Sequence, residues 1–283
     1  MATAGRRLLI QQKLSLTGVN PKFPSLRVFE NGASSDYHAM QIQVQRRLSR
    51  GLQALGSYTW SHAIDTASTD VFSSNSVLIR GNSDFDVRHN VAAALTYDIL
   101  VPKSNNFANA MARNWGVDLH LNARSALPVV NTSNVYNITS GTLIEPLTGV
   151  QVPRRVNLIS GVPIYLDDPT VPGGRIINRA AFSVPLVGQQ GTLGRNVIRG
   201  FPFWQIDMAV RRQFNLTDKL SLQFRAEAFN VFNHPNFGTV QTSLTSPTFG
   251  RATEMLNTRL GGLNPLYQVG GPRSMQFALK LEF

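Results

Sequence analysis

The chain of 283 residues contains no cysteine, which excludes disulfide bonds and thiolate metal sites. Histidine is scarce, and the five histidines stand too far apart in the sequence for a local metal-binding motif. No HExxH, GxSxG or GxGxxG pattern is present, and "GRNVIRG" (194–200) lacks the lysine and spacing of a phosphate-binding loop. We therefore predict no metal, no cofactor and no catalytic residue, and we expect that the protein is not an enzyme.

Long apolar segments are also missing. No stretch approaches the roughly 20 apolar residues of a transmembrane helix, and the start, "MATAGRRLLIQQ", has an apolar run too short for the core of a secretory signal. Helical periodicity is poor throughout, so we expect almost no long helix. If the protein contacts a membrane, it must do so by a route other than a helix.

Acidic residues are few, since 16 Asp and Glu stand against 27 Lys and Arg. The basic residues are scattered along the chain rather than massed, and they are not interleaved with an aromatic stacking platform of the kind that nucleic-acid surfaces use. Bulk charge alone indicates non-specific association, for which an anionic lipid surface is one admissible partner. We expect no nucleic-acid partner.

Two short acidic groups could be interpreted as acid/base or calcium-binding residues. Asp84 and Asp86 share a face in "NSDFDVRHN" (82–90), and Asp167 and Asp168 lie in a loop rich in proline and glycine. Neither group has a third partner in the sequence, as a calcium site or a catalytic pair would need. We therefore expect these carboxylates to be solvated at strand edges and in loops.

The clearest structural signal is a hairpin in "YHAMQIQVQRRLSRGLQALGSYTW" (37–60). Apolar and polar residues alternate on both sides of "SRG", so each strand has one apolar and one polar face. We expect Leu48 to pair with Leu52 across a three-residue loop, with Gly51 in the left-handed conformation that such loops favour. The same pattern returns at 90–97, 115–122, 204–211, 220–227 and 274–283, and more weakly at 9–17. The sequence thus predicts an all-β fold, an antiparallel meander of about seven or eight strands.

The connections between these strands distinguish two kinds of β protein. They are short at 49–51 and 215–219 but long at 62–88, 125–202 and 230–273, and short and long ends alternate. Outer-membrane barrels combine short periplasmic turns with long external loops, and about 9 to 11 tilted residues cross the hydrocarbon. We therefore predict transmembrane strands that form a partial segment of a large outer-membrane β-barrel. The alternative is a soluble or surface-exposed β-sandwich that binds, for example, carbohydrate.

In an outer-membrane barrel the polar face of each strand lines the lumen. The predicted lumen-lining residues are Gln41, Gln43, Gln45, Gln53, Asp118, His120, Asn122, Asp207, Arg225 and Glu227. Within this set we expect an ion pair between Asp207 and Arg225 on adjacent strands. Aromatic residues near strand ends would form two girdles at the lipid interfaces: Tyr58, Trp60 and Trp204 at the outer interface, and Tyr97, Trp115 and Phe214 at the inner one.

Five segments together resemble a known family. They are "YHAMQIQVQRRLSRGLQALGSYTWSHAID", "NSDFDVRHNVAAALTYDI", "GTLGRNVIRGFPFWQIDMAVRRQF", "LQFRAEAFNVFNHPNFG" and "RSMQFALKLEF". In order and spacing, from about residue 37 to 283 and more weakly over 1–36, they resemble the C-terminal part of the barrel of TonB-dependent transporters of the Oar-like type. The resemblance implies a plugged outer-membrane barrel of about 22 strands, often preceded by a carboxypeptidase-regulatory-like domain and energised by TonB. It places residues 1–283 in the cell outer membrane.

The same resemblance implies the partners: outer-membrane lipid, the TonB system acting through the plug, the barrel-assembly machinery, and an unidentified bulky solute. Plug, TonB box, signal peptide and the earlier barrel strands have no counterpart in this sequence, so we expect a fragment of a receptor or the product of a displaced start. The final segment, "MQFALKLEF" (275–283), would turn its apolar residues to lipid. The resemblance implies that the assembly machinery reads this strand, and the predicted signal comprises Phe277, Leu279, Leu281 and Phe283.

Overall fold

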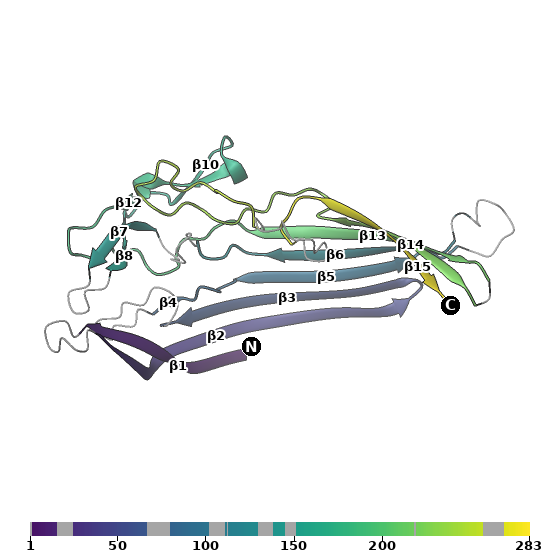
Figure 1. Ribbon diagram of the computed structural model, residues 1–283, viewed down its shortest axis with the longest axis horizontal. Helices are drawn as coiled ribbons and strands as arrows, with labels where there is room; N and C mark the ends of the chain where they lie inside the picture. The colour runs from purple at the N-terminus through teal and green to yellow at the C-terminus, as the bar shows by residue number, and fades with distance from the viewer. Residues whose placement is uncertain are drawn as a thin grey trace.

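A computed structural model describes residues 2–15, 25–66, 80–101, 111, 113–129, 138–144, 151–217, 219–256 and 269–283. Its main feature is a nine-stranded antiparallel sheet whose long strands lie side by side in chain order (Figure 1). These are β1 (Ala2–Ser15), β2 (Ser25–Ser49), β3 (Leu52–Asp65), β5 (His89–Asp98), β6 (Trp115–Arg124), β13 (Phe203–Asn215), β14 (Ser221–Phe229) and β15 (Ser274–Glu282), and the short β4 (Gly81–Asn82) pairs with β3. The predicted antiparallel meander is confirmed.

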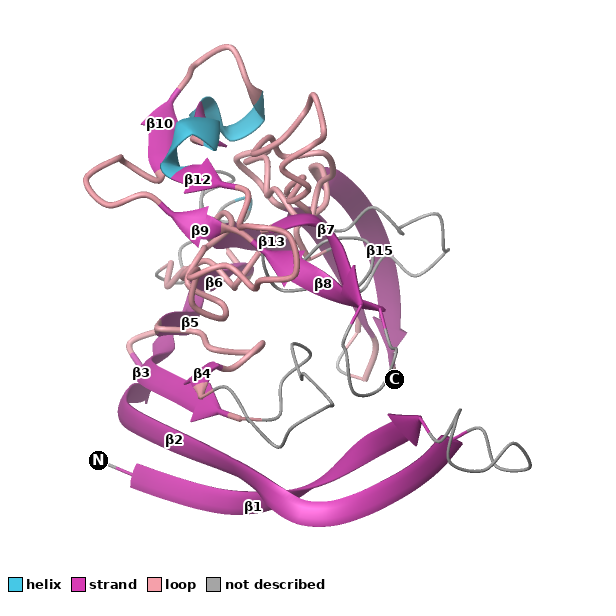
Figure 2. Ribbon diagram, turned by 90° about the vertical axis from the view of Figure 1, so that its left-hand side faces the viewer, coloured by secondary structure: helices cyan, strands magenta, loops and turns pink. Residues whose placement is uncertain are grey.

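The main sheet is curved and open. Figure 2 shows it bending round from β1 and β2 at the bottom of the view to β15 at the right. β1 and β15 stand at the two ends of the strand order and are not paired with each other. The described residues therefore form a curved wall with two free edges, which is consistent with a segment of a large barrel.

The turn between β2 and β3 differs from the expected one. The predicted pairing of Leu48 with Leu52 is wrong, because a bulge between Arg46 and Ser49 shifts the register and brings Ser49 opposite Leu52. The loop therefore has two residues, Arg50 and Gly51, with φ angles of 51° and 76°. Positive φ at both central positions is the requirement of the tightest hairpin turns, and glycine meets it without steric cost.

The long connections gather at the opposite end of the sheet (Figure 1). They contain the short strands β7 (Thr139–Ile144), β8 (Gln151–Arg155), β9 (Asn157–Leu158), β10 (Tyr165–Asp167), β11 (Arg175–Ile177) and β12 (Phe182–Ser183), with 3-10 turns η1 (Pro172–Gly174) and η2 (Arg179–Ala181). We call this unit, residues 138–144, 151–202 and 230–256, the cap. None of the helices among the described residues is long and apolar enough to cross a membrane.

The buried apolar core lies in the cap and the segment leading to it. Its members come from the connections that follow β6 and β14: Val129, Ile138, Val156, Ile177, Ala181, Phe182, Leu193, Ile198, Val240, Leu244 and Phe249. Phe182 and Phe249 pack edge to face with ring centroids 6.1 Å apart. The cap is thus a folded unit with its own core, which ordinary loops of this length do not have.

The main sheet differs from the cap, because apolar side chains on it are exposed while several small or polar side chains are buried. On its apolar face, Phe277 and Leu279 expose 72% and 71% of their surface, whereas Gln205 and Ala209 on the polar face expose 3% and 5%. Among the described residues, no second sheet of comparable size covers the apolar face. The β-sandwich alternative, in which two apolar faces meet, is therefore not the fold of this chain, and the exposed face fits contact with lipid.

This orientation predicts effects of different size for two neighbouring substitutions in β2. Val44 lies on the apolar face and is 68% exposed, whereas its neighbour Gln43 lies on the polar face. Val44→Arg should lower the free energy of unfolding in lipid vesicles by about 2–4 kcal/mol, because a charge near the bilayer midplane is costly. Gln43→Arg should change it by less than about 1 kcal/mol. Urea titration followed by tryptophan fluorescence measures both, and equal losses would contradict the orientation.

Candidate functional site

The polar face of the main sheet, which we call the inner wall, carries all ten predicted lumen-lining residues. Strand register places them in neighbouring rows, one of which runs from Gln45 through His120 to Asp207. A cavity of about 460 Å³ lies on this wall, and six of the ten line it: Asp118, His120, Asn122, Asp207, Arg225 and Glu227. The other four, Gln41, Gln43, Gln45 and Gln53, lie exposed on the same wall and do not line the cavity.

Arg225 of β14 is the centre of a charge network on the inner wall. Its Nη1 lies 2.7 Å from Asp118 Oδ2, and its Nε lies 2.6 Å from Glu227 Oε1. Gln276 Nε2 donates to the other carboxylate oxygen, Glu227 Oε2. Asp118 stands on β6, so the Arg225 side chain reaches across β13. The residue of β13 that lies opposite both Asp118 and Glu227 is Ala209, whose small side chain leaves room for this contact.

Arg211 of β13 makes the same kind of contact one strand earlier. Its guanidinium donates to Asp98 of β5, across β6, and its Nε lies 3.5 Å from Asp118 Oδ2. The residue crossed on β6 is Gly116, where an added Cβ would lie 2.6 Å from Cζ of Arg211. The two arginines thus form a ladder of charges that joins β5, β6, β13 and β14, and Gln276 extends it to β15.

The predicted ion pair between Asp207 and Arg225 is wrong. Arg211 lies opposite Arg225 in the β13–β14 register, and Asp207 lies opposite His120 of β6. Asp207 instead accepts hydrogen bonds from Gln205 Nε2 at 2.7 Å and from the backbone amide of Asn230 at 2.8 Å. Asp207 therefore fixes the start of the connection that follows β14. Arg225 pairs with Asp118 and Glu227 instead.

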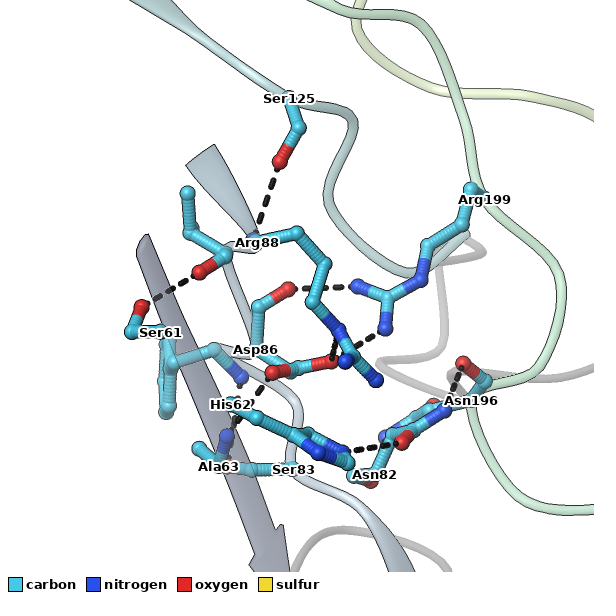
Figure 3. Close-up of polar contacts among 12 residues, drawn as sticks. Ser61, His62, Ala63, Asn82, Ser83, Asp86, Arg88, Ser125, Asn196 and Arg199 are labelled. Atoms are coloured by element: carbon cyan, nitrogen blue, oxygen red, sulfur yellow. Dashed lines mark hydrogen bonds and ion pairs between the residues drawn. The ribbon is translucent and has the colours of Figure 1, made fainter. Parts of the chain in front are cut away.

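The mouth of the wall is tied to the cap by a buried carboxylate (Figure 3). Asp86 is fully buried, and its Oδ1 accepts a hydrogen bond from the Ala63 amide at 2.8 Å. Its Oδ2 accepts from Arg88 Nε at 3.1 Å and from Arg199 Nη2, while Arg199 Nη1 donates to the Asp86 carbonyl oxygen. We call this contact between segments 82–90 and 194–200 the latch.

A second group of contacts lies beside Asp86. Arg195 is 2% exposed, and its Nη2 lies 2.7 Å from Asp65 Oδ1 at the end of β3. Asn196, which is fully buried, donates from Nδ2 to Asp84 Oδ1 at 2.8 Å. The segment "GRNVIRG", which lacks the features of a phosphate-binding loop, is therefore the half of the latch that the cap provides.

The four aspartates that were expected to be solvated behave differently in the structure. Asp84 and Asp86 are buried and hydrogen-bonded, so the expected solvation at a strand edge is wrong for them. Asp167 is exposed, as expected, and Asp168 is partly exposed. The Thr170 hydroxyl and amide donate to Asp168 and lower the pKa of that carboxyl.

The predicted girdle residues lie on the apolar face at opposite ends of the strands. Tyr58 and Trp204 fall in one row with Val91 and Ala123 between them, while Tyr97 lies about 20 Å further along the strands. At the short-turn end, the Arg212 guanidinium lies 5.1 Å from the Trp115 ring centroid and 4.5 Å from that of Phe214. Trp60 lies opposite Met40 and His89 on the same face as Tyr58. Their contact with lipid interfaces stays a prediction.

The end of the chain lies at this short-turn end as well. Phe277, Leu279 and Leu281 project from the apolar face of the edge strand β15, and Phe283 is fully exposed. At the opposite end, His234 stacks on Trp204 with ring centroids 4.1 Å apart, and partial burial lowers the pKa of this histidine. Among the described residues, no three His, Asp or Glu side chains gather in a group that could hold a metal ion.

Several residues of the site were not predicted from the sequence. Arg211, Asp98 and Gly116 of the charge ladder and Arg195 and Arg199 of the latch were not singled out as functional residues. One signal was available for the ladder: Arg211 continues the polar face that Asp207 begins. For the latch no local signal exists, since Asp86 and Arg199 are far apart in sequence and meet only through the fold.

An open, curved sheet with an apolar outer face, a polar inner wall and a folded cap at one end defines a class, the β-barrels of the outer membrane. Comparison with protein families agrees: residues 4–276 match the family described as the outer membrane beta barrel domain. The chain therefore belongs to this family, and its location is the outer membrane. A comparison with curated proteins finds no match.

The charge ladder predicts a loss of stability when its central arginine is removed. Arg225→Ala leaves Asp118 and Glu227 without this partner on a partly buried wall, so the free energy of unfolding in lipid vesicles should fall by about 1–2 kcal/mol. Lys280→Ala is the matched control, because Lys280 and Glu282 form a similar pair that is largely exposed, and its loss should change the free energy of unfolding little. Equal unfolding midpoints in urea would exclude a structural role for Arg225.

The latch predicts that one charge controls the docking of the cap. Asp86→Asn keeps the shape of the side chain but removes the carboxylate that Arg88 and Arg199 share. Opening of the segment 191–200 should become easier by about 2–4 kcal/mol, because a broken buried ion pair leaves charges uncompensated. Hydrogen exchange of the Val129 amide, which lies outside the cap and donates to the Ile198 carbonyl within it, measures this opening. Asp168→Asn in an exposed cap loop should leave the exchange rate unchanged, and a similar rate in both variants would contradict the latch.

Proposed function

We propose that the chain forms part of the barrel of a TonB-dependent receptor that moves a bulky solute across the outer membrane. The observation that carries the proposal is the inner wall, where a cavity of about 460 Å³ lies beside charged and amide side chains under a folded cap. Polar groups that line a water-filled or plugged lumen are typical of large outer-membrane barrels. The sequence resemblance to Oar-like transporters supports the same function.

The chemistry of the wall supports transport rather than catalysis. Asp118 is paired with Arg225 and Arg211, Glu227 is paired with Arg225, and Asp207 accepts two hydrogen bonds. A catalytic pair of carboxylates needs environments that separate their pKa values, with one group held ready to give or take a proton. We propose that these carboxylates shape the wall and contact passing solute, and that the chain makes or breaks no bond.

The partners follow from the same proposal. The apolar face of the sheet contacts outer-membrane lipid, the TonB system acts through a plug, and the cap meets the solute first. The exposed Phe283 at the end of β15 is positioned for recognition by the barrel-assembly machinery, a role that stays a prediction.

The test compares cells that carry the intact gene with cells in which it is disrupted. If the chain belongs to an energised receptor, cells with the intact gene should deplete one or more bulky solutes from a complex medium that disrupted cells leave behind. A protonophore should abolish the difference, because TonB draws on the inner-membrane proton gradient. Mass spectrometry of the spent medium measures the depletion. Identical depletion by both strains, or depletion that the protonophore does not affect, would contradict the proposal.

A further inference from the structure

A second cavity, of about 340 Å³, lies at the junction of the cap and the inner wall. It is lined by the end of β6, the start of β13 and the connections that continue from β6 and β14, and it shares no lining residue with the cavity on the inner wall. Its size is in the range of small-molecule sites.

Apolar side chains, three of them phenylalanines, share the lining of this junction cavity with polar groups. The rings of Phe201 and Phe237 lie 5.1 Å apart at an interplanar angle of 53°, and Phe203 is 7% exposed. The remaining apolar lining includes Leu127, Met255 and Leu256. Tilted aromatic rings at this spacing offer both faces and edges to a further ring, which favours a flat aromatic ligand.

One cation lines the cavity without an acidic partner. Arg124 lies opposite Phe203 in the β6–β13 register, is half-buried, and has its Cζ 5.8 Å from the Phe203 ring centroid. In the part of the chain that the structure describes, no carboxylate pairs with it, whereas Arg199, Arg211 and Arg225 are all paired. A partly desolvated guanidinium is stabilised by an anion that meets it with hydrogen bonds.

The acidic residue that shares the cavity does not neutralise Arg124. Glu254 is exposed at the rim, and its Oε2 accepts a hydrogen bond from the Thr239 hydroxyl at 3.1 Å. An exposed carboxylate is well hydrated and interacts weakly with charges at a distance. The cavity therefore combines phenylalanine rings with one positively charged group, the Arg124 guanidinium.

We propose that the junction cavity binds an aromatic carboxylate, with the carboxylate paired to Arg124 and the ring packed against Phe201, Phe203 and Phe237. Arg124 then selects for the charge of the ligand, while the phenylalanines select for its flat apolar body. The proposal concerns binding alone and goes beyond transport. It holds whether or not the bound molecule then passes along the inner wall.

The experiment separates charge from shape with two isosteric probes, 2-naphthoate and 2-naphthamide. Isothermal titration of the detergent-solubilised chain, with a detergent blank, gives both dissociation constants. The unmodified chain should bind the carboxylate about tenfold more tightly than the carboxamide, as a charge-assisted pair replaces a neutral hydrogen bond. Arg124→Gln should remove this preference and leave carboxamide binding within about twofold. Arg251→Gln, which removes an exposed arginine of the cap, should retain the tenfold preference.

A third variant tests the aromatic wall. Phe237→Leu should weaken both probes by the same factor, about threefold or more, because it removes a ring contact and no charge. Heat-modifiable migration checks that each variant is assembled. Equal affinity of the unmodified chain for the two probes, or a preference that survives Arg124→Gln, would overturn the proposal. Charge-selective naphthoate binding together with identical solute depletion by intact and disrupted cells would instead count against the transport proposal alone.

Discussion

The structure depends on the apolar face of the main sheet, because the medium that covers this face is lipid. Lipid offers no hydrogen bonds, so the backbone of each strand must be satisfied by its neighbours, which produces a long antiparallel meander. A face that contacts lipid contributes nothing to an internal core. The described residues accordingly place their compact apolar core in the cap and leave small and polar side chains on the inner wall.

Charges on such a wall are partly removed from water, and this determines how they are arranged. A surface ion pair contributes little to the free energy of unfolding. A carboxylate on a partly buried wall, however, lowers it when the carboxylate has no partner. Arg211 and Arg225 provide partners two strands away, and Gly116 and Ala209 keep their paths open. Each arginine thus joins strands that share no backbone hydrogen bonds, which stiffens the wall across its width while the cavity beside it stays open.

Alternation of apolar and polar residues is local, and from residue 37 onward it predicted the strands of the main sheet and their two faces, while the connection lengths predicted the end at which the long connections gather. It did not predict that β2 begins at Ser25 or that β1 spans Ala2–Ser15. It did not predict register, because a shift by an even number of residues keeps every side chain on its face. The expected pair of Asp207 with Arg225 failed for this reason, although both residues lie on the predicted wall. The latch was beyond any local pattern, since Asp86 and Arg199 are brought together only when the cap folds. The bulge before Arg50 likewise depends on the pairing of whole strands.

The arginines at the mouth of the wall differ in how their charge is used. Arg195 and Arg199 pair with carboxylates from the end of β3 and from the segment before β5. Their charges therefore stabilise the docking of the cap. Arg124 lies at the same junction but faces a phenylalanine ring and open volume, and among the described residues it forms no ion pair with a carboxylate. If structure alone determined this position, a neutral residue would avoid the cost of desolvating the guanidinium. A ligand anion offsets that cost only when it is bound, so the charge of Arg124 makes occupancy of the cavity dependent on the charge of the ligand.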